Sequence, residues 1–408
     1  MATSDTTEWT AEAAWAGSRG PVEQAHGLPA ACYSDPHFFE LERARIFGTS
    51  WVGVALTADV VEPGTVLVRR VADQSILITR NTEGELRAFH NSCRHRGTEL
   101  AEHDCQIAKM IRCPYHRWGY DLDGALVATP LFAEAGIDDF DAADYGLHPV
   151  RVAEWAGLCF VCLDPDTVPL ASWLGDLPER MAGYGLDAWQ PRDRVEVDVA
   201  ANWKLVSENF QEHYHLGWVH PELAKVSRVA DHYRYQGPGM YCGQCTTPVS
   251  SDDRDDWTAM PPAPGLSRSD ADSGRFVAIF PNVLLAVLPN HAFVMLLDPV
   301  APGLTRETCT WTLPPKTDAT DEAFAKNRAF WLDINNEDID IVTKAQRGMD
   351  HGGFSPGRLS PRFEEPLHRF HNMVADRFVG HARIPPGDPS DTADLYGSGV
   401  NPNPPVRS

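Results

Sequence analysis

Two short loops in this chain each pair one cysteine with one histidine. The first is Cys93-Arg-His95, and after seventeen further residues the second follows as Cys113-Pro-Tyr-His116. Thiolate sulfur and neutral imidazole nitrogen suit either a tetrahedral zinc ion or a [2Fe-2S] cluster in which two histidines replace two cysteines on one iron. The spacing alone does not choose between these two metal sites.

The way the ligand types are divided between the loops favours the iron-sulfur cluster. A structural zinc motif usually takes two cysteines from one loop and two histidines from the other, whereas here each loop can give one ligand to each iron. The segment that follows, Arg117 to Asp121, resembles the cluster-binding loops of the Rieske family. The resemblance assigns Cys93 and Cys113 to one iron, and His95 and His116 to the other.

A second group of candidate ligands follows a predicted helix. Its apolar residues recur at helical intervals from residue 203 to residue 214, so one face of this helix is expected to be buried. His215 and His220 would stand about 140° apart on an ideal helix, so they can meet only if the helix breaks. Gly217 is predicted to provide that break, and Pro221 biases His220 toward an extended conformation. An isolated pair of this kind would more often be ordinary surface or core histidines, but beside the cysteine-containing loops it indicates a metal site.

The third ligand of such a site should be a carboxylate. A mononuclear iron that activates oxygen needs two histidines and one acid on one face, which leaves the other positions open. Asp338 has apolar helical neighbours, whereas those of Asp340 are polar. We therefore predict Asp338 as the ligand, with Glu337 as the alternative. The predicted helix that carries these acids also carries Asp333.

The elements that must position these residues follow from the pattern of the chain. Short β-rich runs separated by Gly, Pro and Asp turns fill residues 51 to 164, as is typical of a small antiparallel sandwich that would carry the Cys/His loops. The rest indicates helices and a second set of strands, and so an α+β chain. The expected helices span Tyr33 to Trp51, Leu170 to Tyr184, Asn202 to His215 and Asp321 to Gln346, with strands from about Phe276 to Leu313.

The predicted organisation has four parts. We expect an N-terminal helical segment at 1–50 that packs on the catalytic domain, a cluster-binding domain at 51–165, a catalytic domain at 166–382 and a disordered tail at 383–408. The stretch from Ser250 to Gly274, rich in Asp, Pro and Ser, is either a lid over a site or a plain solvated connection.

Composition bounds the class of protein. The 408 residues carry a net charge of -22, which argues against nucleic acid or an anionic membrane as a partner. The most apolar run, Val283 to Leu297, is interrupted by Pro289, and the first ten residues lack the features of a signal peptide. The nine cysteines, an odd number, fit metal ligands in a reducing compartment better than a disulfide framework. We therefore expect a cytoplasmic protein.

Taken together, the two sets of candidate ligands resemble the large (alpha) subunit of the Rieske non-heme iron oxygenases. The resemblance rests on both Cys/His loops, on Asn202-Trp203-Lys204, on the Glu-x-x-His-x(4)-His run and on Glu337-Asp338. It implies an N-terminal Rieske β-sandwich domain and a C-terminal catalytic domain in which helices pack on a curved antiparallel sheet, a helix-grip or START-like fold. It also implies His215, His220 and Asp338 as ligands of a mononuclear Fe(II).

The resemblance implies roles for two further residues of the predicted helix. Glu212 stands where a family carboxylate links the iron site to a cluster histidine of a neighbouring subunit, here His116. Most family members have Asp at this position, so the longer Glu alters the expected bridge. Asn209 resembles a polar residue near the iron. A bridge between subunits would require an oligomer, and the resemblance implies a head-to-tail homotrimer.

The implied activity is oxygen-dependent hydroxylation. Oxygen is the co-substrate, and NAD(P)H would supply electrons through a separate flavin and iron-sulfur reductase, possibly with a ferredoxin, because the chain has no Gly-x-Gly-x-x-Gly fingerprint. Arg228 and the Glu212 form of the bridge resemble the branch that acts on quaternary ammonium compounds such as glycine betaine, choline or carnitine, by N-demethylation or C-hydroxylation. The alternative is a mono- or dioxygenase of aromatic rings. Aromatic candidates for holding a cation, each of which could equally be core packing, are Tyr214, Trp218, Trp257, Phe276, Phe280 and Phe293.

Two other classes of protein would explain part of the sequence. A non-enzymatic electron carrier needs the cluster but leaves the entire second domain without a role, and a zinc-stabilised interaction protein would be colourless. Cys242 and Cys245 have the spacing of a zinc or redox motif. The other pair with this spacing, Cys159 and Cys162, lies in an apolar predicted strand where the two side chains would point to opposite faces, so we interpret it as packing and the placement of Cys242 and Cys245 as incidental.

Overall fold

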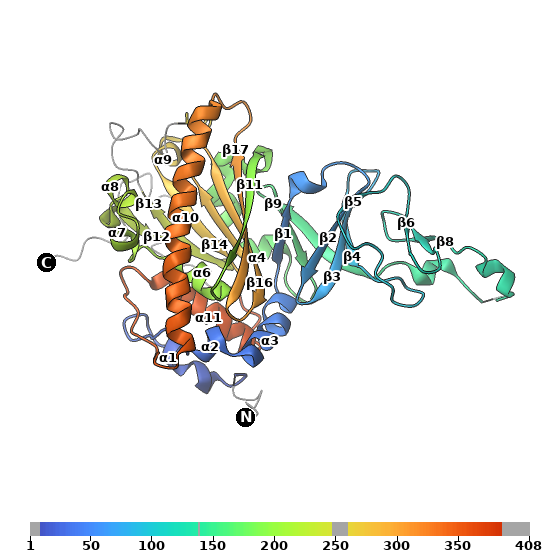
Figure 1. The fold of residues 1–408 in the computed structure, drawn as a ribbon, viewed down its shortest axis with the longest axis horizontal. Coiled ribbons are helices and arrows are strands. Elements are labelled where there is room, and N and C mark those ends of the chain that lie inside the picture. Colours follow the sequence, from blue (N-terminus) through green and yellow to red (C-terminus); the bar gives the residue numbers. More distant parts are fainter. Residues whose placement is uncertain (1–8, 138, 247–259, 386–408) are drawn as a thin grey trace. The chain divides into compact units, whose positions relative to one another are not determined.

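The computed structural model describes residues 9–137, 139–246 and 260–385 of the chain. These residues form two compact units (Figure 1). Unit 1 is built from the described parts of Met1–Ile46 and Val168–Ser408, and unit 2 is Phe47–Thr167. The N-terminal helices therefore belong to the same unit as the part of the chain from Val168 onward, and the Cys/His loops lie in the other unit.

Unit 2 is built from two antiparallel sheets. Its larger sheet has the strand order β1-β10-β9-β4-β3-β2-β5, and its smaller sheet has the order β6-β7-β8. Cys93 and Cys113 are part of the same buried apolar cluster as Phe89 and Trp118, so the core of the unit reaches the Cys/His loops. The strands are β1 (Val52–Leu56), β2 (Thr65–Val71), β3 (Gln74–Arg80), β4 (Leu86–His90), β5 (Cys105–Gln106), β6 (Ile111–Arg112), β7 (Gly119–Tyr120), β8 (Leu126–Ala128), β9 (Pro149–Trp155) and β10 (Leu158–Cys162).

Unit 1 contains a single large antiparallel sheet among its described residues. Its order, β11-β17-β16-β15-β14-β13-β12, reverses the chain order after β11. Strands β14 and β15 are buried along almost their whole length, which explains their nearly continuous apolar sequence. The strands are β11 (Gln190–Val199), β12 (His232–Arg234), β13 (Tyr241–Thr246), β14 (Gly274–Ile279), β15 (Val283–Val287), β16 (Ala292–Ala301) and β17 (Leu304–Leu313).

Helices cover this sheet. The central helix α6 contacts β13, β14 and β16 and also contacts α10, so it lies between the sheet and the long helix that runs over it (Figure 1). Helix α11 packs on β13 and α6. The helices are α1 (Ala16–Arg19), α2 (Ala31–Ser34), α3 (Pro36–Arg45), α4 (Leu170–Leu174), α5 (Leu177–Met181), α6 (Trp203–Gln211), α7 (Leu216–Val219), α8 (Leu223–Val226), α9 (Arg268–Ala271), α10 (Asp321–Asp350) and α11 (Glu365–Val379).

Capping side chains fix where the two site-bearing helices begin. Asn202 accepts a hydrogen bond from the N–H of Lys204 at the start of α6. Thr320 does the same for the N–H of Ala323 at the start of α10, where acidic residues in the first turn also favour the helix dipole. The ammonium of Lys204 is fully buried against the carboxylate of Glu42, which ties α6 to α3. The N-terminal helices thus help to hold the central helix in place.

Four expectations about the helices are wrong in detail. The helix expected from Leu170 to Tyr184 is divided into α4 and α5, because Gly175, with a positive φ of +60°, ends α4. The helix expected from Tyr33 to Trp51 is interrupted at Asp35, which caps a separate helix α3 that begins at Pro36 and ends at Arg45. The helix expected from Asn202 to His215 ends at Gln211. The break expected at Gly217 occurs earlier, at Glu212, and Gly217 lies inside α7.

The structure also adds elements that the sequence pattern did not reveal. The sequence pattern did not predict strands β11 and β13 or the helix α11. Strand β11 is polar at most positions and β13 contains Gly, Gln and Thr, so neither strand has a clear apolar signal. The helix expected from Asp321 to Gln346 is one turn longer, ending at Asp350.

The remaining expectations concern segments that are only partly described. The candidate lid, Ser250 to Gly274, lies outside the described residues up to residue 259, and the expected tail at 383–408 lies outside them from residue 386. Within the described ranges, the helices lack the combination of length and apolar character that crossing a bilayer requires. All nine cysteines are free thiols, Cys242 and Cys245 included.

Candidate metal centres and substrate pocket

The two Cys/His loops of unit 2 have closely similar turns. Cys93 follows β4, and its carbonyl accepts the N–H of Gly97 at 2.8 Å. Cys113 follows β6, and its carbonyl accepts the N–H of Arg117 at 3.1 Å. In both turns the residue four positions after the cysteine has a positive φ, +74° for Gly97 and +62° for Arg117. Arg117 adopts this conformation without the freedom of glycine, so the loop geometry is maintained at the cost of some backbone strain.

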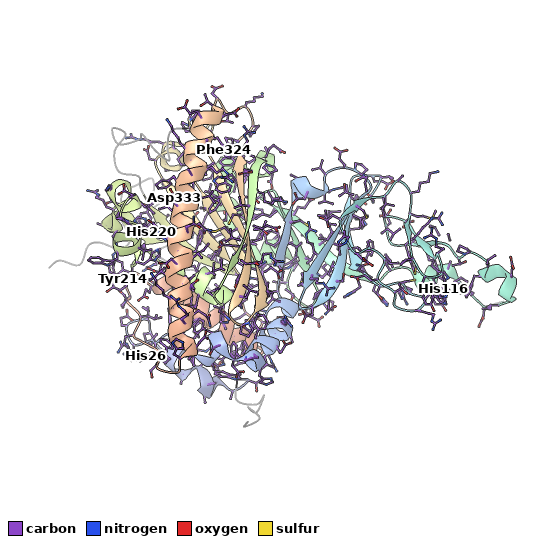
Figure 2. The ribbon with its side chains drawn as sticks, in the orientation of Figure 1. His26, His116, Tyr214, His220, Phe324 and Asp333 are labelled. Carbon is purple, nitrogen blue, oxygen red and sulfur yellow. The ribbon has the colours of Figure 1, made fainter. Side chains whose placement is uncertain are left out.

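The two histidines of the loops face each other. The ring centroids of His95 and His116 are 4.6 Å apart in an edge-to-face arrangement, and His95 stacks on Trp118 at 4.8 Å. The Nδ1 atom of His95 is buried, and the described part of the chain provides no hydrogen-bond partner for it. An orphaned imidazole nitrogen of this kind suits a metal ligand. Figure 2 labels His116 among these loops.

The sulfur of Cys93 has a hydrogen-bond donor beside it, the hydroxyl of Tyr120. The hydroxyl of Tyr120 accepts the N–H of Arg94 at 3.0 Å and lies 3.3 Å from Sγ of Cys93, so its proton is available to the sulfur. Burial raises the pKa of the Cys93 thiol, and the neighbouring Cys113 raises it further. Two buried neighbouring thiols lose their protons readily only when a cation compensates their charge. The donor set and its surroundings therefore fit a [2Fe-2S] cluster with two Cys and two His ligands.

The three predicted iron ligands of unit 1 come together. Nε2 of His220 lies 3.2 Å from Nε2 of His215 and 2.9 Å from Oδ1 of Asp338, and the Asp338 oxygen lies 3.5 Å from Nε2 of His215. One ligand atom from each residue lies within 4.8 Å of the others. His220 lies beside α10 (Figure 2). The arrangement of two imidazoles and one carboxylate matches the donor set of a mononuclear non-heme iron site.

Two further carboxylates hold the outer nitrogens of these imidazoles. Glu212 contacts Nδ1 of His215, and Oε2 of Glu337 lies 2.7 Å from Nδ1 of His220. Each acid therefore accepts the Nδ1 proton, which leaves the Nε2 lone pair directed at the common centre. Glu337, the alternative ligand on sequence grounds, contacts the outer nitrogen of His220, whereas Asp338 lies beside the Nε2 atoms of both histidines.

Glu212 also shapes the backbone that brings the histidines together. Its extended conformation, φ -113° and ψ 168°, ends α6. Its carboxylate then accepts the N–H groups of Tyr214 and His215, which begin the turn leading into α7. His220 ends α7 at φ -117° and ψ 70°. The two histidines thus lie at the two ends of the short helix α7. The carboxylate of Glu212, just before this helix, contacts both backbone N–H groups and the side chain of His215.

The charge of this site favours a cation. Burial opposes protonation of the two imidazoles, but the hydrogen bonds and charges of Glu212 and Asp338 outweigh it for His215 and raise its pKa. Asp338 and Glu337 likewise raise the pKa of His220 against the effect of its burial. The same three carboxylates that favour protonated imidazoles concentrate negative charge, which a divalent cation would offset in place of the protons. The residues present therefore fit an Fe(II) ion.

A cavity opens beside this group, with a volume of about 730 Å³ including its mouth. Part of its wall is one row of residues paired across four neighbouring strands: Gln244 with Phe276, Phe276 with Ala286, and Ala286 with Phe293. Helix α10 contributes side chains that are three and four residues apart and so lie on one face of the helix. This face places Asp338 at the same cavity as the sheet. The lining residues of α10 are Trp331, Ile334, Asn335 and Asp338.

Of the six predicted aromatic residues, two line the cavity. Phe276 and Phe293 line the cavity, each with its ring centroid about 6 Å from that of Trp331. Tyr214 and Trp218 are exposed, at 52% and 85% of their surface. Two further candidates are elsewhere: Phe280 is buried against Trp173, and Trp257 lies outside the described residues.

The remaining predicted residues are placed as follows. Asn209 and Glu212 both line the cavity. The guanidinium of Arg228 is ion-paired with Asp231 at 2.6 Å, and its side chain is 66% exposed. Cavity residues that sequence reasoning missed are Phe210, Ser227, His232, Gln244, Thr246, Trp331 and Asn335. The alternation of Gln244 and Thr246 along one strand was the available signal for two of them.

The comparisons with known proteins agree with this geometry. The ring-hydroxylating alpha subunit catalytic domain matches residues 186–380, and the Rieske [2Fe-2S] domain matches residues 50–145. The glycine betaine monooxygenase oxygenase subunit of Chromohalobacter salexigens is 30% identical over 394 residues, covering 87% of this chain and 86% of that protein. The carnitine monooxygenase oxygenase subunit of Escherichia coli K12 is 26% identical and covers 87% and 95%.

Solved structures show the same fold. The quaternary ammonium Rieske monooxygenase CntA, in complex with an inhibitor, superposes with a TM-score of 0.74 at 25% identity, covering 88% of this chain and 96% of that one. Naphthalene 1,2-dioxygenase from Rhodococcus, at 21% identity, superposes with a TM-score of 0.72 over 93% and 97% of the two chains. The two-domain α+β fold expected from the sequence is therefore confirmed.

Proposed function

The chain belongs to the alpha subunits of the Rieske non-heme iron oxygenases, and from this membership we propose that it is an oxygen-dependent monooxygenase of quaternary ammonium compounds. It is an iron-dependent oxidoreductase with a Rieske [2Fe-2S] cluster and a mononuclear iron. The proposal extends this to the substrate, for which glycine betaine, choline and carnitine are the reference compounds, because relatives are named for them.

The observation that carries the proposal is the composition of the cavity beside the three candidate iron ligands. Aromatic rings from α6, the sheet and α10 line it, and aromatic faces attract a cation that has lost its water. Two carboxylates, Glu212 and Asp338, add negative potential, while the described lining residues include neither Lys nor Arg. A permanently charged ammonium group with methyl substituents suits such walls better than an anion does. The aromatic lining residues are Phe210, Phe276, Phe293 and Trp331.

The residues around the proposed metal sites contribute to the chemistry by orienting the metal ligands. When bound, Fe(II) at His215, His220 and Asp338 would activate oxygen, with electrons delivered through the cluster. Glu212 and Glu337 keep the Nδ1 protons of the two imidazoles, so that the Nε2 atoms are free to bind metal. The apolar rings exclude water from the carbon that is to be hydroxylated.

The electron supply requires other proteins. Relatives are oxygenase subunits of systems that include a separate reductase, and a reductase is accordingly part of the proposal. We further propose a head-to-tail homotrimer in which Glu212, whose carboxylate contacts His215 at the candidate iron site, links to His116 of the partner subunit. A cytoplasmic location is also proposed, because nine free cysteines suit a reducing compartment.

A single-turnover experiment tests the proposed substrate class without the native reductase. The iron-loaded protein would be reduced with dithionite, freed of reductant and mixed with oxygen-18 and one candidate compound. We expect a trimethylammonium compound to yield a product, or a released aldehyde, that carries one labelled oxygen atom per reaction. Labelled product from an aromatic hydrocarbon, with none from glycine betaine, choline or carnitine, would overturn the proposed class in favour of aromatic ring oxygenation.

A further inference from the structure

One part of the cavity wall is polar, and its side chains are almost completely buried. Ser227, His232, Thr246 and Gln244 line it at 3%, 2%, 3% and 7% exposure. They come from the segment after α8 and from the paired strands β12 and β13, where His232 is opposite Thr246. Buried polar groups at a ligand cavity usually determine which functional group of the ligand is accepted. The direction of each hydrogen bond therefore matters.

Three of these side chains form a chain of hydrogen bonds with a fixed direction. Nδ1 of His232 lies 2.8 Å from the carbonyl oxygen of Arg228, so Nδ1 carries the proton and Nε2 is an acceptor. Burial, which is the main cause, lowers the pKa of His232 to about 4, so the ring is neutral at pH 7. The hydroxyl of Ser227, at 3.3 Å, donates to Nε2 and in turn accepts the hydroxyl of Thr246 at 3.2 Å. Both hydroxyl protons are engaged inside the protein.

The orientation of the Gln244 amide is also fixed by its hydrogen bonds. Its amide nitrogen lies 2.8 Å from the carbonyl oxygen of Glu212 and 3.4 Å from that of Phe210, and both of these groups can only accept. The nitrogen is therefore the donor, which makes the other amide atom the carbonyl oxygen, Oε1. That oxygen is buried and has no hydrogen-bond partner among the residues that the structure describes. A buried carbonyl oxygen without a donor is costly, so it calls for a donor from the occupant of the cavity.

The same wall offers little to an anion. The lining residues that the structure describes include no Lys or Arg, and the guanidinium of Arg228 is turned to solvent and paired with Asp231. The amide of Asn335, which also lines the cavity, donates to Glu307 at 3.0 Å. A carboxylate placed against Gln244 would meet its acceptor oxygen and would lack a compensating Lys or Arg, which is strongly unfavourable.

We propose that the substrate is an ammonium alcohol, a methylated cation whose second polar group is a hydroxyl that donates to Gln244 Oε1, and that ammonium carboxylates are poor substrates. This inference rests on the proposed function and narrows it. The aromatic rings would bind the ammonium group of the substrate. The acceptor oxygen of Gln244 would select a substrate whose other end donates a hydrogen bond. A site built to receive a hydroxyl proton discriminates strongly against a ligand that cannot provide one.

Calorimetric binding to the iron-loaded protein under nitrogen tests the selection with three probes of one cation type. The probes are choline, which has a hydroxyl, glycine betaine, which has a carboxylate, and tetramethylammonium, which has neither. We expect choline to bind at least about 10-fold more tightly than glycine betaine, with tetramethylammonium between them. Glycine betaine binding as tightly as choline would overturn the inference but leave the proposed function standing. Failure of all three to bind would instead count against the proposed function.

Two variants test whether the named wall is responsible. Gln244→Met removes the orphan acceptor. It should weaken choline binding by about 2- to 10-fold, the value of one hydrogen bond, and change tetramethylammonium binding by less than about 2-fold. Thr312→Val is the control and should change neither, because Thr312 is buried in β17 of the same sheet but does not line the cavity. Equal losses for both ligands would show general disruption of the pocket and would contradict the selective role.

Discussion

Oε2 of Glu337 lies 2.7 Å from Nδ1 of His220, on the side of the ring opposite the candidate iron position. The next residue, Asp338, places Oδ1 2.9 Å from Nε2 of the same ring. Two consecutive acids on α10 thus contact the two nitrogens of one imidazole ring. This geometry separates their expected roles, because one carboxylate orients the ligand and the other completes the metal site.

Replacing Asp338 should abolish the mononuclear site and spare the cluster. In Asp338→Ala we expect oxygenation to fall by more than about 100-fold, a larger loss than that typical of an outer partner, because a metal ligand is removed. Iron analysis and EPR of the reduced protein measure the two centres separately. Asp333→Ala, an exposed acid on the same helix, is the control. Loss of the cluster signal in Asp338→Ala would contradict the assignment.

Replacing Glu337 should have a graded effect on the same site. In Glu337→Gln the side chain keeps its size but holds the Nδ1 proton of His220 less strongly, so iron affinity should fall by about 10- to 100-fold. Competition with a chelator measures this affinity. The loss should be smaller than in Asp338→Ala, and activity should recover when Fe(II) is added in excess. No change in affinity would show that the 2.7 Å contact does not support the metal site.

The hydroxyl of Tyr120 should tune the cluster. Its hydrogen bond to Sγ of Cys93 stabilises the more negative, reduced state, so Tyr120→Phe should lower the reduction potential. A hydrogen bond of about 1 kcal/mol corresponds to about 40 mV for one electron. Protein-film voltammetry measures the potential. Tyr145→Phe is the control, since that ring packs on Trp118 nearby, and an equal shift there would contradict a specific role for Tyr120.

The buried ion pair between Lys204 and Glu42 should be essential to stability. Lys204→Met would leave the Glu42 carboxylate buried without its cation, which should lower the free energy of unfolding by about 3–5 kcal/mol. The double variant with Glu42→Leu should recover most of this loss, because it removes the stranded charge as well. Urea denaturation measures all three proteins. A double variant no more stable than Lys204→Met would show that the loss comes from packing and not from charge.

Glu307 should make stability depend on pH. Burial raises the pKa of this carboxyl to about 7, against 4.5 for the free group. Between these values the folded protein holds a proton that the unfolded chain releases, so this contribution to stability is full at low pH and is lost as pH rises toward 7, with a total of about 3 kcal/mol.

Glu307→Gln should remove that dependence, because the amide cannot ionise. Relative to the wild type, the variant should gain stability between pH 5 and pH 8, as followed by thermal unfolding at each pH. Parallel pH profiles for the two proteins would contradict the raised pKa of Glu307.

The parts of the site that sequence could predict are those with local signals. The Cys/His loops and the acid on the apolar face of α10 are visible in spacing and periodicity, and the structure brings His215, His220 and Asp338 together. The break between the histidines was placed wrongly, at Gly217, because the end of α6 depends on a side-chain contact. Glu212 caps the following turn while holding His215, and no propensity rule contains that information.

The cavity wall was mostly beyond sequence reasoning for a different reason. Gln244 and Ser227 are ordinary polar residues in the sequence, and their importance comes from pairing between distant strands and from the direction of their hydrogen bonds. Conversely, Trp218 was a reasonable aromatic candidate, but its side chain is 85% exposed. Tertiary packing decides both cases.

This one chain should carry both a Rieske cluster and a mononuclear iron. Protein purified without oxygen should be assayed for iron and zinc and examined by low-temperature EPR before and after reduction with dithionite. We predict about three irons per chain, two in the cluster and one at the mononuclear site, with a Rieske signal on reduction. A colourless protein that contains zinc would contradict the account, and cluster iron alone in a fully loaded sample would contradict the assignment of His215, His220 and Asp338.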